Sequence, residues 1–307
     1  MNSPENKVNN EWFDYYQKFD YFSHDKIREG CYPTMMEHEG ADKAIVLVHG
    51  LTDSPYFMGA IAYHFHHNLG YNVYLPLLHF HGLKEPKGME GVDLREWKAN
   101  VRFAIKSAAS KVNQVSIGGL STGGTLSFYM ACISPKINGD LYLFSAALDL
   151  AGGPLGVFGE IIERLLRTGV TEWLDRIDGK KPLIGENPYR YARIDKDGAR
   201  ELVRLIKETD DLLDEYDDKD PFPKRVFAAH SEFDHTADIQ GILNLKKVTP
   251  PDRFTFFKIP KKLKVPHASL VLKENIETDI STKNKKVFEE ANPSFNDMME
   301  AITFFQK

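Results

Sequence analysis

The segment VSIGGLSTGGTLS at 115–127 places one serine, Ser121, among four glycines. Glycine inside regular structure costs about 0.5 to 1 kcal/mol relative to alanine, so four in one short stretch require a backbone reason. The residues GLSTG at 119–123 have the G-x-S-x-G spacing of a sharp turn that lifts a serine hydroxyl out of a strand. The chemistry that this spacing predicts is nucleophilic attack by Ser121.

Two other glycine-rich sites do not fit these residues. A phosphate-binding loop needs a lysine directly after its last glycine, and none follows Gly123 or Gly124. A dinucleotide fingerprint needs G-x-G-x-x-G, whereas this stretch begins with two adjacent glycines, Gly118 and Gly119. The remaining alternative is a glycine-rich turn with an incidental serine, and it is weakened if a strand precedes the turn and a helix follows it.

A serine nucleophile needs a base and a third group that orients the base. After a G-x-S-x-G turn these partners follow in the chain order serine, carboxylate, histidine. Asp234 is our candidate carboxylate, because it comes four residues after a predicted strand that ends near His230. Glu232 and Asp238 are local competitors, and Asp149 is a distant one.

The candidate base is His267, the final histidine of the chain, in the loop after the last predicted strand. Only His235 also follows Asp234, and an adjacent residue cannot easily turn back onto its neighbour and also reach Ser121. A histidine with a purely structural role in this loop is the remaining alternative.

Acyl transfer also needs N–H donors for the oxyanion, and removal of one costs about 2.7 to 4 kcal/mol. The residue after the nucleophile, Thr122, supplies one backbone donor. The loop HGLTDSP at 49–55 follows an apolar strand and supplies the other, which we assign to Leu51.

The elements that must position these residues alternate along the chain. Short apolar runs predict buried strands at 43–49, 72–76, 112–118, 140–146, 225–230 and 254–260. Helical patterns occur at 55–68, 93–110, 122–133 and 293–306, the last with Asn292 as N-cap and Pro293 at the first helical position. This alternation predicts an α/β fold with a doubly wound, mostly parallel sheet. It also provides the strand before Ser121 and the helix after it.

The interval 149–222 is too long for an ordinary connection and has no convincing strand. Two apolar stripes at helical spacing run through 158–174 and 202–216. We therefore predict a helical cap at 149–222, inserted in a core formed by 1–148 and 223–307. The stripes either dock on the main domain or line a pocket.

Composition limits the classes of partner. The 39 basic and 44 acidic residues give a net charge of −5, which argues against general affinity for nucleic acid or anionic membranes. No run approaches the roughly 18 apolar residues that span a bilayer, and no secretory pattern opens the chain, so we expect a cytoplasmic protein unless a leader was removed. The two cysteines and the histidines lack the spacing of a zinc site, and the acidic run at 208–220 lacks that of a calcium loop. We expect no metal.

Over about 43–305 the chain resembles the α/β-hydrolase superfamily, in its bacterial carboxylesterase and monoacylglycerol lipase branch. The resemblance rests on HGLT at 49–52, on GLSTG at 119–123, and on Asp234 and His267 in the appropriate loops. It implies the α/β-hydrolase fold, a Ser121, Asp234 and His267 triad, an oxyanion hole from Leu51 and Thr122, a cap over the acyl pocket at 149–222, and no cofactor.

The chain departs from the pattern of this branch at three places. Many members have Gly-His-Gly where this chain has HFHG at 79–82, glycine where it has Ser231, and methionine where it has Thr122. The first two changes would alter the pocket rim, whereas the third retains the backbone donor.

From these residues we expect a serine hydrolase that cleaves small carboxylic esters with an apolar acyl or alcohol group. A thioesterase, an amidase or peptidase, or a carbon–carbon bond hydrolase would use the same triad, and a non-catalytic ligand receptor could share the fold. The sequence leaves these alternatives and the oligomeric state open.

Overall fold

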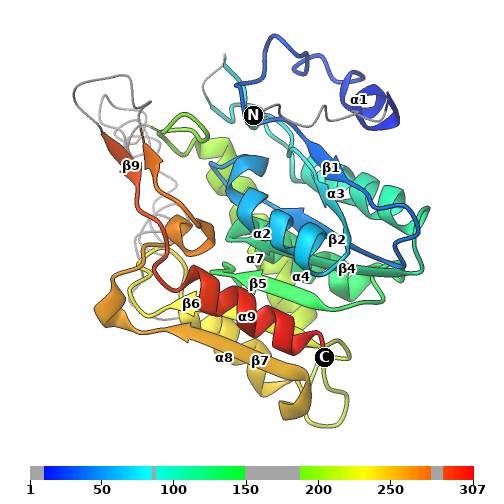
Figure 1. Ribbon diagram of the computed structural model, residues 1–307, viewed down its shortest axis with the longest axis vertical. Helices are drawn as coiled ribbons and strands as arrows, with labels where there is room; N and C mark the ends of the chain where they lie inside the picture. The colour runs from blue at the N-terminus through cyan, green and yellow to red at the C-terminus, as the bar shows by residue number, and fades with distance from the viewer. Residues whose placement is uncertain (1–9, 85–87, 149–186, 278–285) are drawn as a thin grey trace.

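The computed structural model describes residues 10–84, 88–148, 187–277 and 286–307 (Figure 1). The main sheet has seven strands, in the spatial order β1-β3-β2-β4-β5-β6-β7. All neighbours are parallel except β1 and β3, which are antiparallel. The strands are β1 (Thr34–Met36), β2 (Lys43–Val48), β3 (Asn72–Leu75), β4 (Gln114–Leu120), β5 (Leu141–Phe144), β6 (Val226–Ser231) and β7 (Phe254–Ile259).

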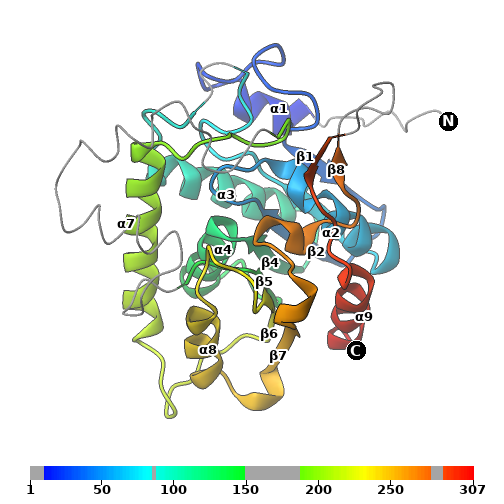
Figure 2. The same cartoon turned by 90° about the vertical axis from the view of Figure 1, so that its left-hand side faces the viewer.

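Helices cover both faces of this sheet, as Figures 1 and 2 show. One buried cluster joins one face of the sheet to α3, α4, α7 and α8, and a second joins the other face to α2 and α9. This arrangement confirms the predicted doubly wound α/β fold. The helices are α1 (Asn10–Tyr16), α2 (Gly59–Tyr63), α3 (Leu94–Ala109), α4 (Thr122–Ile133), α7 (Lys196–Leu213), α8 (Ile239–Lys247) and α9 (Phe295–Phe305).

The six predicted strands correspond to β2 through β7, with ends that differ by at most two residues. They are identifiable because strands buried on both faces are apolar along their whole length. Strand β1 was not predicted. It has only three residues and lies at the sheet edge, where its antiparallel partner β3 pairs Thr34 with Leu75.

The aromatic N-terminal region, for which the sequence predicted no helix or strand, packs onto the core. Trp12 and Tyr16 of α1 are almost fully buried, and Tyr15 stacks on Phe103 of α3 at 3.8 Å between ring centroids. The Tyr16 hydroxyl accepts a hydrogen bond of 2.8 Å from the Leu77 N–H. Helix α1 therefore fixes the segment that follows β3.

The predicted start of α9 was wrong. The N-cap position is Ser294, and the helix begins at Phe295. Asn292 instead closes a turn, because its side-chain oxygen accepts from Ser294 N–H at 2.8 Å and its amide donates to Leu270 O at 2.8 Å. Asparagine favours both helix caps and such turns, so the sequence signal was misassigned. The Asn292 amide connects the start of α9 to the 3-10 turn η5 (Ala268–Val271), which follows His267.

Of the predicted cap, residues 149–186 lie outside the described residues, and their role as a cap stays a prediction. In the remainder, α7 packs against α3 and α4. Leu202, Leu205 and Ile206 of its apolar stripe are buried in the same cluster as the sheet. Of the two alternatives for this second stripe, the structure therefore shows docking on the main domain.

Candidate active site

Ser121 occupies the turn between β4 and α4 in a strained conformation. Its backbone has φ 54° and ψ −121°, in a region that non-glycine residues rarely adopt. Such conformations cost about 1 to 3 kcal/mol and persist where the surroundings enforce them. Here Ser121 N–H donates to Phe144 O of β5, and Ser121 O accepts from Thr125 N–H, both at 3.0 Å. The turn holds Ser121 at the N-terminus of α4, where the helix dipole favours negative charge.

The glycines around Ser121 are required by close approach of backbone. A Cβ atom on Gly119 would lie 2.5 Å from Val48 O of β2, and one on Gly118 would lie 2.6 Å from Tyr142 O of β5. A Cβ on Gly123 would overlap Val48 O even more severely. The neighbouring strands therefore leave no room for side chains at these positions, which explains the glycine cluster in the sequence.

Asp234 and His267 form a hydrogen-bonded pair. The distance between Asp234 Oδ2 and His267 Nδ1 is 2.7 Å, and the Asp234 side chain is fully buried. The other carboxylate oxygen accepts from the backbone N–H groups of Thr236 and Ala237 at 2.8 and 3.2 Å. Because an ionised carboxylate only accepts, His267 Nδ1 carries the proton and Nε2 is the basic atom.

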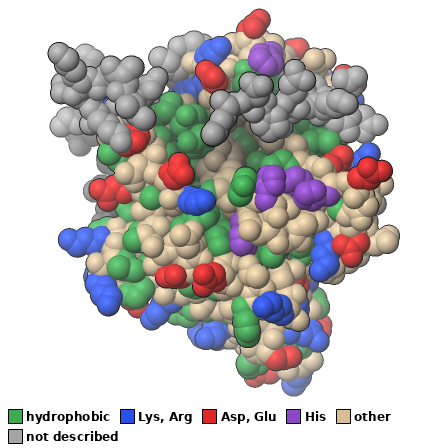
Figure 3. Space-filling model, viewed as in Figure 1, with side chains coloured by type: hydrophobic (Ala, Val, Ile, Leu, Met, Phe, Trp, Pro, Cys, Tyr) green, Lys and Arg blue, Asp and Glu red, His purple; other side chains and the backbone are tan. Residues whose placement is uncertain are grey.

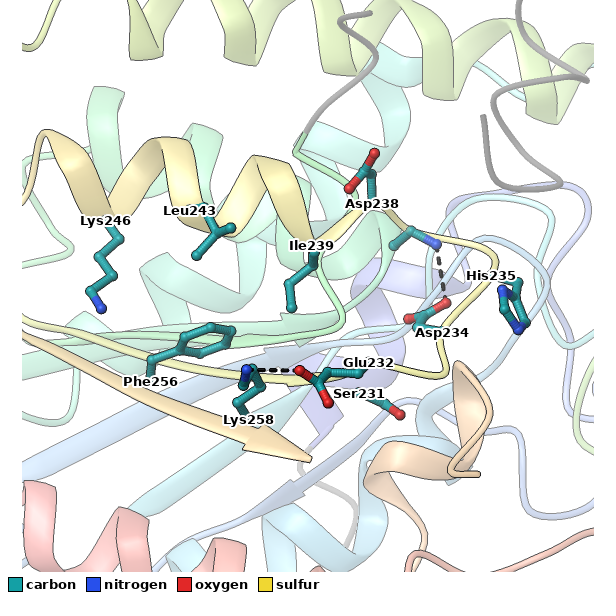
Figure 4. A pocket seen from close by; sticks show the side chains of 11 residues that line it. Ser231, Glu232, Asp234, His235, Asp238, Ile239, Leu243, Lys246, Phe256 and Lys258 are labelled. Carbon is teal, nitrogen blue, oxygen red and sulfur yellow. Dashed lines mark hydrogen bonds and ion pairs between the residues drawn. The ribbon is translucent and has the colours of Figure 1, made fainter. Parts of the chain in front are cut away.

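The competing candidates have other partners. Glu232 is exposed and pairs with Lys258 at 2.7 Å (Figure 4). Asp238 caps α8, because its carboxylate accepts from Gln240 N–H at 2.8 Å. His235 is exposed, and its ring contacts Phe233. Asp149 lies outside the described residues. The structure thus unites Asp234 with His267 and leaves the described alternatives apart from that pair.

The protonation states suit a histidine base. Burial opposes a charge on His267, but the Asp234 carboxylate outweighs it and raises the histidine pKa. Burial likewise opposes the charge on Asp234, yet the facing imidazole holds the carboxyl pKa well below its usual range. Asp234 is therefore ionised at neutral pH. The nearby His230, 3.7 Å from Asp234, has a pKa that burial lowers.

His267 Nε2 is buried and has no hydrogen-bond partner among the described residues, so no bond joins it to Ser121 in this structure. Catalytic contacts of this kind are often long in free enzymes and shorten in the substrate complex. Ser121 does lie against the loop at 49–55, because a Cβ on Gly50 would be 3.4 Å from Ser121 Cβ.

That loop also presents Leu51. Its carbonyl oxygen is 2.5 Å from His81 Nε2, and the carbonyl of Thr52 accepts from Tyr191 N–H at 2.8 Å. Within the described part of the chain, no hydrogen bond engages Leu51 N–H. Thr122 N–H begins α4 and has no intrahelical acceptor. Neither predicted oxyanion donor therefore has a hydrogen-bond acceptor among the described residues.

The remaining histidines form no metal site with the other residues that the structure describes. Figure 3 shows histidine side chains gathered on one face of the molecule. The rings of His38 and His66 stack at 3.8 Å between their centroids. In the ranges that the structure describes, no three His, Cys, Asp or Glu side chains are grouped to hold a metal ion.

Comparison with known proteins identifies the family. No protein-family model matches the chain. A thermostable monoacylglycerol lipase from Bacillus sp. (strain H-257) is 30% identical over 218 residues, which cover 68% of this chain and 80% of the lipase. The chain belongs to the lipase and esterase branch of the α/β-hydrolases. This hydrolase is an ester-hydrolysing enzyme, as its sequence motifs predicted.

Solved structures of other proteins share the fold of this hydrolase. One of the metagenome-derived lipolytic enzymes LipS and LipT matches with a TM-score of 0.66 at 18% identity, covering 92% of this chain and 99% of the other. A Paleococcus ferrophilus monoacylglycerol lipase matches with a TM-score of 0.55 at 15% identity, covering 89% and 97%. No described helix of the hydrolase is long and apolar enough to cross a membrane.

Sequence reasoning missed three charged residues of the hydrolase. Asp53, which belongs to the loop at 49–55, is buried together with Arg190 and Glu289. Asp53 lies inside the HGLTDSP motif, so its position was a usable signal. Nothing in the sequence connects Arg190 or Glu289 with that motif, because only the tertiary structure unites them.

Proposed function

We propose that this hydrolase is a serine esterase that cleaves carboxylic esters through an acyl-enzyme on Ser121. The observation that carries the proposal is the Asp234–His267 hydrogen bond, which leaves Nε2 as a buried base without a partner among the described residues. The strained turn at Ser121 and the N–H groups of Leu51 and Thr122 support the same mechanism.

In this mechanism His267 Nε2 takes the proton from Ser121 Oγ while the oxygen attacks the ester carbonyl carbon. The N–H groups of Leu51 and Thr122 stabilise the oxyanion. The imidazolium then gives its proton to the leaving alcohol, and a water deprotonated by His267 releases the acid. Asp234 keeps the histidine in the required tautomer and stabilises its cationic form.

For the substrate we propose a small ester with an apolar acyl or alcohol group. The Bacillus relative, a monoacylglycerol lipase by name, supports this class. Thioesters, amides and carbon–carbon bonds are alternatives for the same triad, and a non-catalytic receptor is the alternative outside enzymes.

A panel of p-nitrophenyl esters from acetate to palmitate tests the proposal, together with a fluorophosphonate probe whose attachment site is mapped by mass spectrometry. We expect ester turnover and a label on Ser121, with pre-labelling abolishing turnover. A label without ester turnover would favour thioester, amide or carbon–carbon chemistry. If the protein shows neither a label nor ester turnover, the non-catalytic receptor is supported instead.

The pH dependence follows from the histidine base. Only neutral imidazole accepts the serine proton, so kcat/KM rises as pH passes upward through the pKa of His267. Because Asp234 raises that pKa, the rise is expected at higher pH than for an ordinary histidine, whose pKa is about 6.5. Initial rates on a soluble ester from pH 5 to 9 measure it. A midpoint below that of a free histidine would contradict the assigned pairing.

A further inference from the structure

Three charged side chains, one of them from the loop at 49–55, are buried together. The turn η1 (Pro55–Met58), at the end of this loop, packs against η5, the turn that follows the proposed catalytic histidine. The side chains of Asp53, Arg190 and Glu289 are only 6%, 9% and 9% exposed. Arg190 Nη2 is 2.5 Å from Glu289 Oε1, and Arg190 Nη1 is 4.0 Å from Asp53 Oδ1. Burying such charges costs several kcal/mol for each ion, and buried pairs often contribute little net stability. Net stability is therefore not the main effect expected of these three charges.

Asp53 belongs to the loop at 49–55. Its N–H donates to Gly50 O at 3.2 Å, which closes a tight turn around Leu51. A Cβ atom on Gly50 would overlap Asp53 Oδ2 and lie 3.4 Å from Ser121 Cβ. The bare α-carbon of Gly50 is thus in contact with the Asp53 carboxylate and close to the nucleophile.

Charged and titratable groups face His267 from four parts of the chain. His230 lies in β6 and Asp234 lies in the loop after it, while Asp53 lies in the loop after β2. Arg190 comes from the segment before α7. Glu289, in β9 (Val287–Glu289), interacts electrostatically with His267 and forms an ion pair with Arg190.

Asp53 and Arg190 act on His267 in opposite directions. The Asp53 carboxylate raises the pKa of His267, and the Arg190 guanidinium lowers it. Burial raises the pKa of Asp53 itself, but Arg190 opposes that effect and favours the ionised form. The charges of Asp53 and Arg190 therefore both affect the pKa of His267, with opposite signs.

We infer that Asp53 is a positioning residue for the reaction, a second carboxylate that stabilises the His267 imidazolium and is itself held in place by its ion pair with Arg190. The inference rests on the proposed function, since it assigns His267 as the base. In each half-reaction the proton moves from oxygen to His267 Nε2 and then to the departing oxygen, and Asp53 neither gains nor loses a proton.

The test measures the pKa of His267 by NMR, using the ring resonances of the histidines labelled with ¹³C and assigned with a His267→Gln variant. This readout does not require turnover. Asp53→Asn is expected to lower the proton affinity of His267 about tenfold, because it removes a nearby negative charge. Arg190→Gln is expected to raise it, and the double variant to return it towards the wild-type value.

Glu201→Gln is the matched control. Glu201 is a buried carboxylate that pairs with Arg204 at 2.9 Å, but it lies on α7 and accepts from Leu94 N–H, apart from the groups that face His267. It is expected to leave the pKa of His267 unchanged. If Arg190→Gln does not fold, the comparison of Asp53→Asn with Glu201→Gln still decides the inference.

The ester kinetics give a second readout. In Asp53→Asn the rise of kcat/KM is expected to shift to lower pH, with kcat about tenfold lower on the plateau because the imidazolium has lost a stabilising charge. An unchanged His267 pKa in Asp53→Asn would overturn the inference even if the wild type hydrolyses esters. A wild type without hydrolase activity would instead refute the proposed function, while the NMR titration would still decide whether Asp53 acts on His267.

Discussion

Replacing Ser121 with alanine is expected to lower ester turnover by about 10⁴-fold or more while the fold stays intact. The change removes the oxygen that would form the acyl-enzyme, and serine hydrolases that lose the nucleophile retain only the contribution of the oxyanion hole and substrate binding. Alanine keeps the Cβ atom, and the Ser121 backbone hydrogen bonds to Phe144 and Thr125 do not involve the hydroxyl. Turnover of a p-nitrophenyl ester and a thermal unfolding curve measure both parts.

Ser127→Ala is the control for this experiment. Ser127 is a buried serine of α4, the helix that follows Ser121, and its hydroxyl donates to Gly123 O at 2.7 Å. The Ser127→Ala variant is expected to retain ester turnover and to take up the fluorophosphonate label as the wild type does. Appreciable esterase activity in Ser121→Ala, with the label on another residue, would refute Ser121 as the nucleophile.

Gly123→Ala is expected to destabilise the protein by about 3 kcal/mol or more, the upper part of the range for overpacked sites. The added Cβ would overlap the carbonyl oxygens of Val48 and His49. Both belong to the backbone, and Val48 is paired with Gly119 in the sheet, so neither can move without separating β2 from β4. Urea unfolding measures the difference in the free energy of unfolding.

Gly59→Ala is the matched control, with the opposite sign. Gly59 begins α2 in a helical conformation with φ −60°, and a Cβ atom there would meet nothing within 4 Å. Alanine should stabilise the protein by about 0.4 to 1 kcal/mol, because it restricts the unfolded chain. Equal stability of Gly123→Ala and the wild type would mean that β2 does not approach the turn as closely as the structure has it.

The parts of this fold that the sequence predicted are those with a local signal. Strands such as β2 and β6 are apolar along their whole length because both faces are covered, and this pattern needs no knowledge of the partner strand. The residues of the candidate site could also be predicted from local patterns. Once Ser121 was located by its glycines, the loops after later strands limited the acid and base to a few residues.

The features that the sequence did not predict depend on contacts between distant segments. An apolar stripe such as that of α7 shows that one face is buried, but it does not show which surface covers it. The burial of Trp12 and the meeting of Asp53 with Arg190 have no local pattern at all. At Asn292 two local structures with the same residue preference competed, and the turn prevailed over the cap.

The packing of the Ser121 turn between two neighbouring strands also affects how the enzyme becomes active during folding. The strained backbone of Ser121 is held by Phe144 of β5, and the glycines beside it are fitted against Val48 of β2. These strands are nearly 100 residues apart in the chain, and contacts of such long range form slowly. A partly folded intermediate can therefore contain its helices and strands and still lack a working nucleophile, so recovered activity reports the completed sheet rather than the appearance of secondary structure.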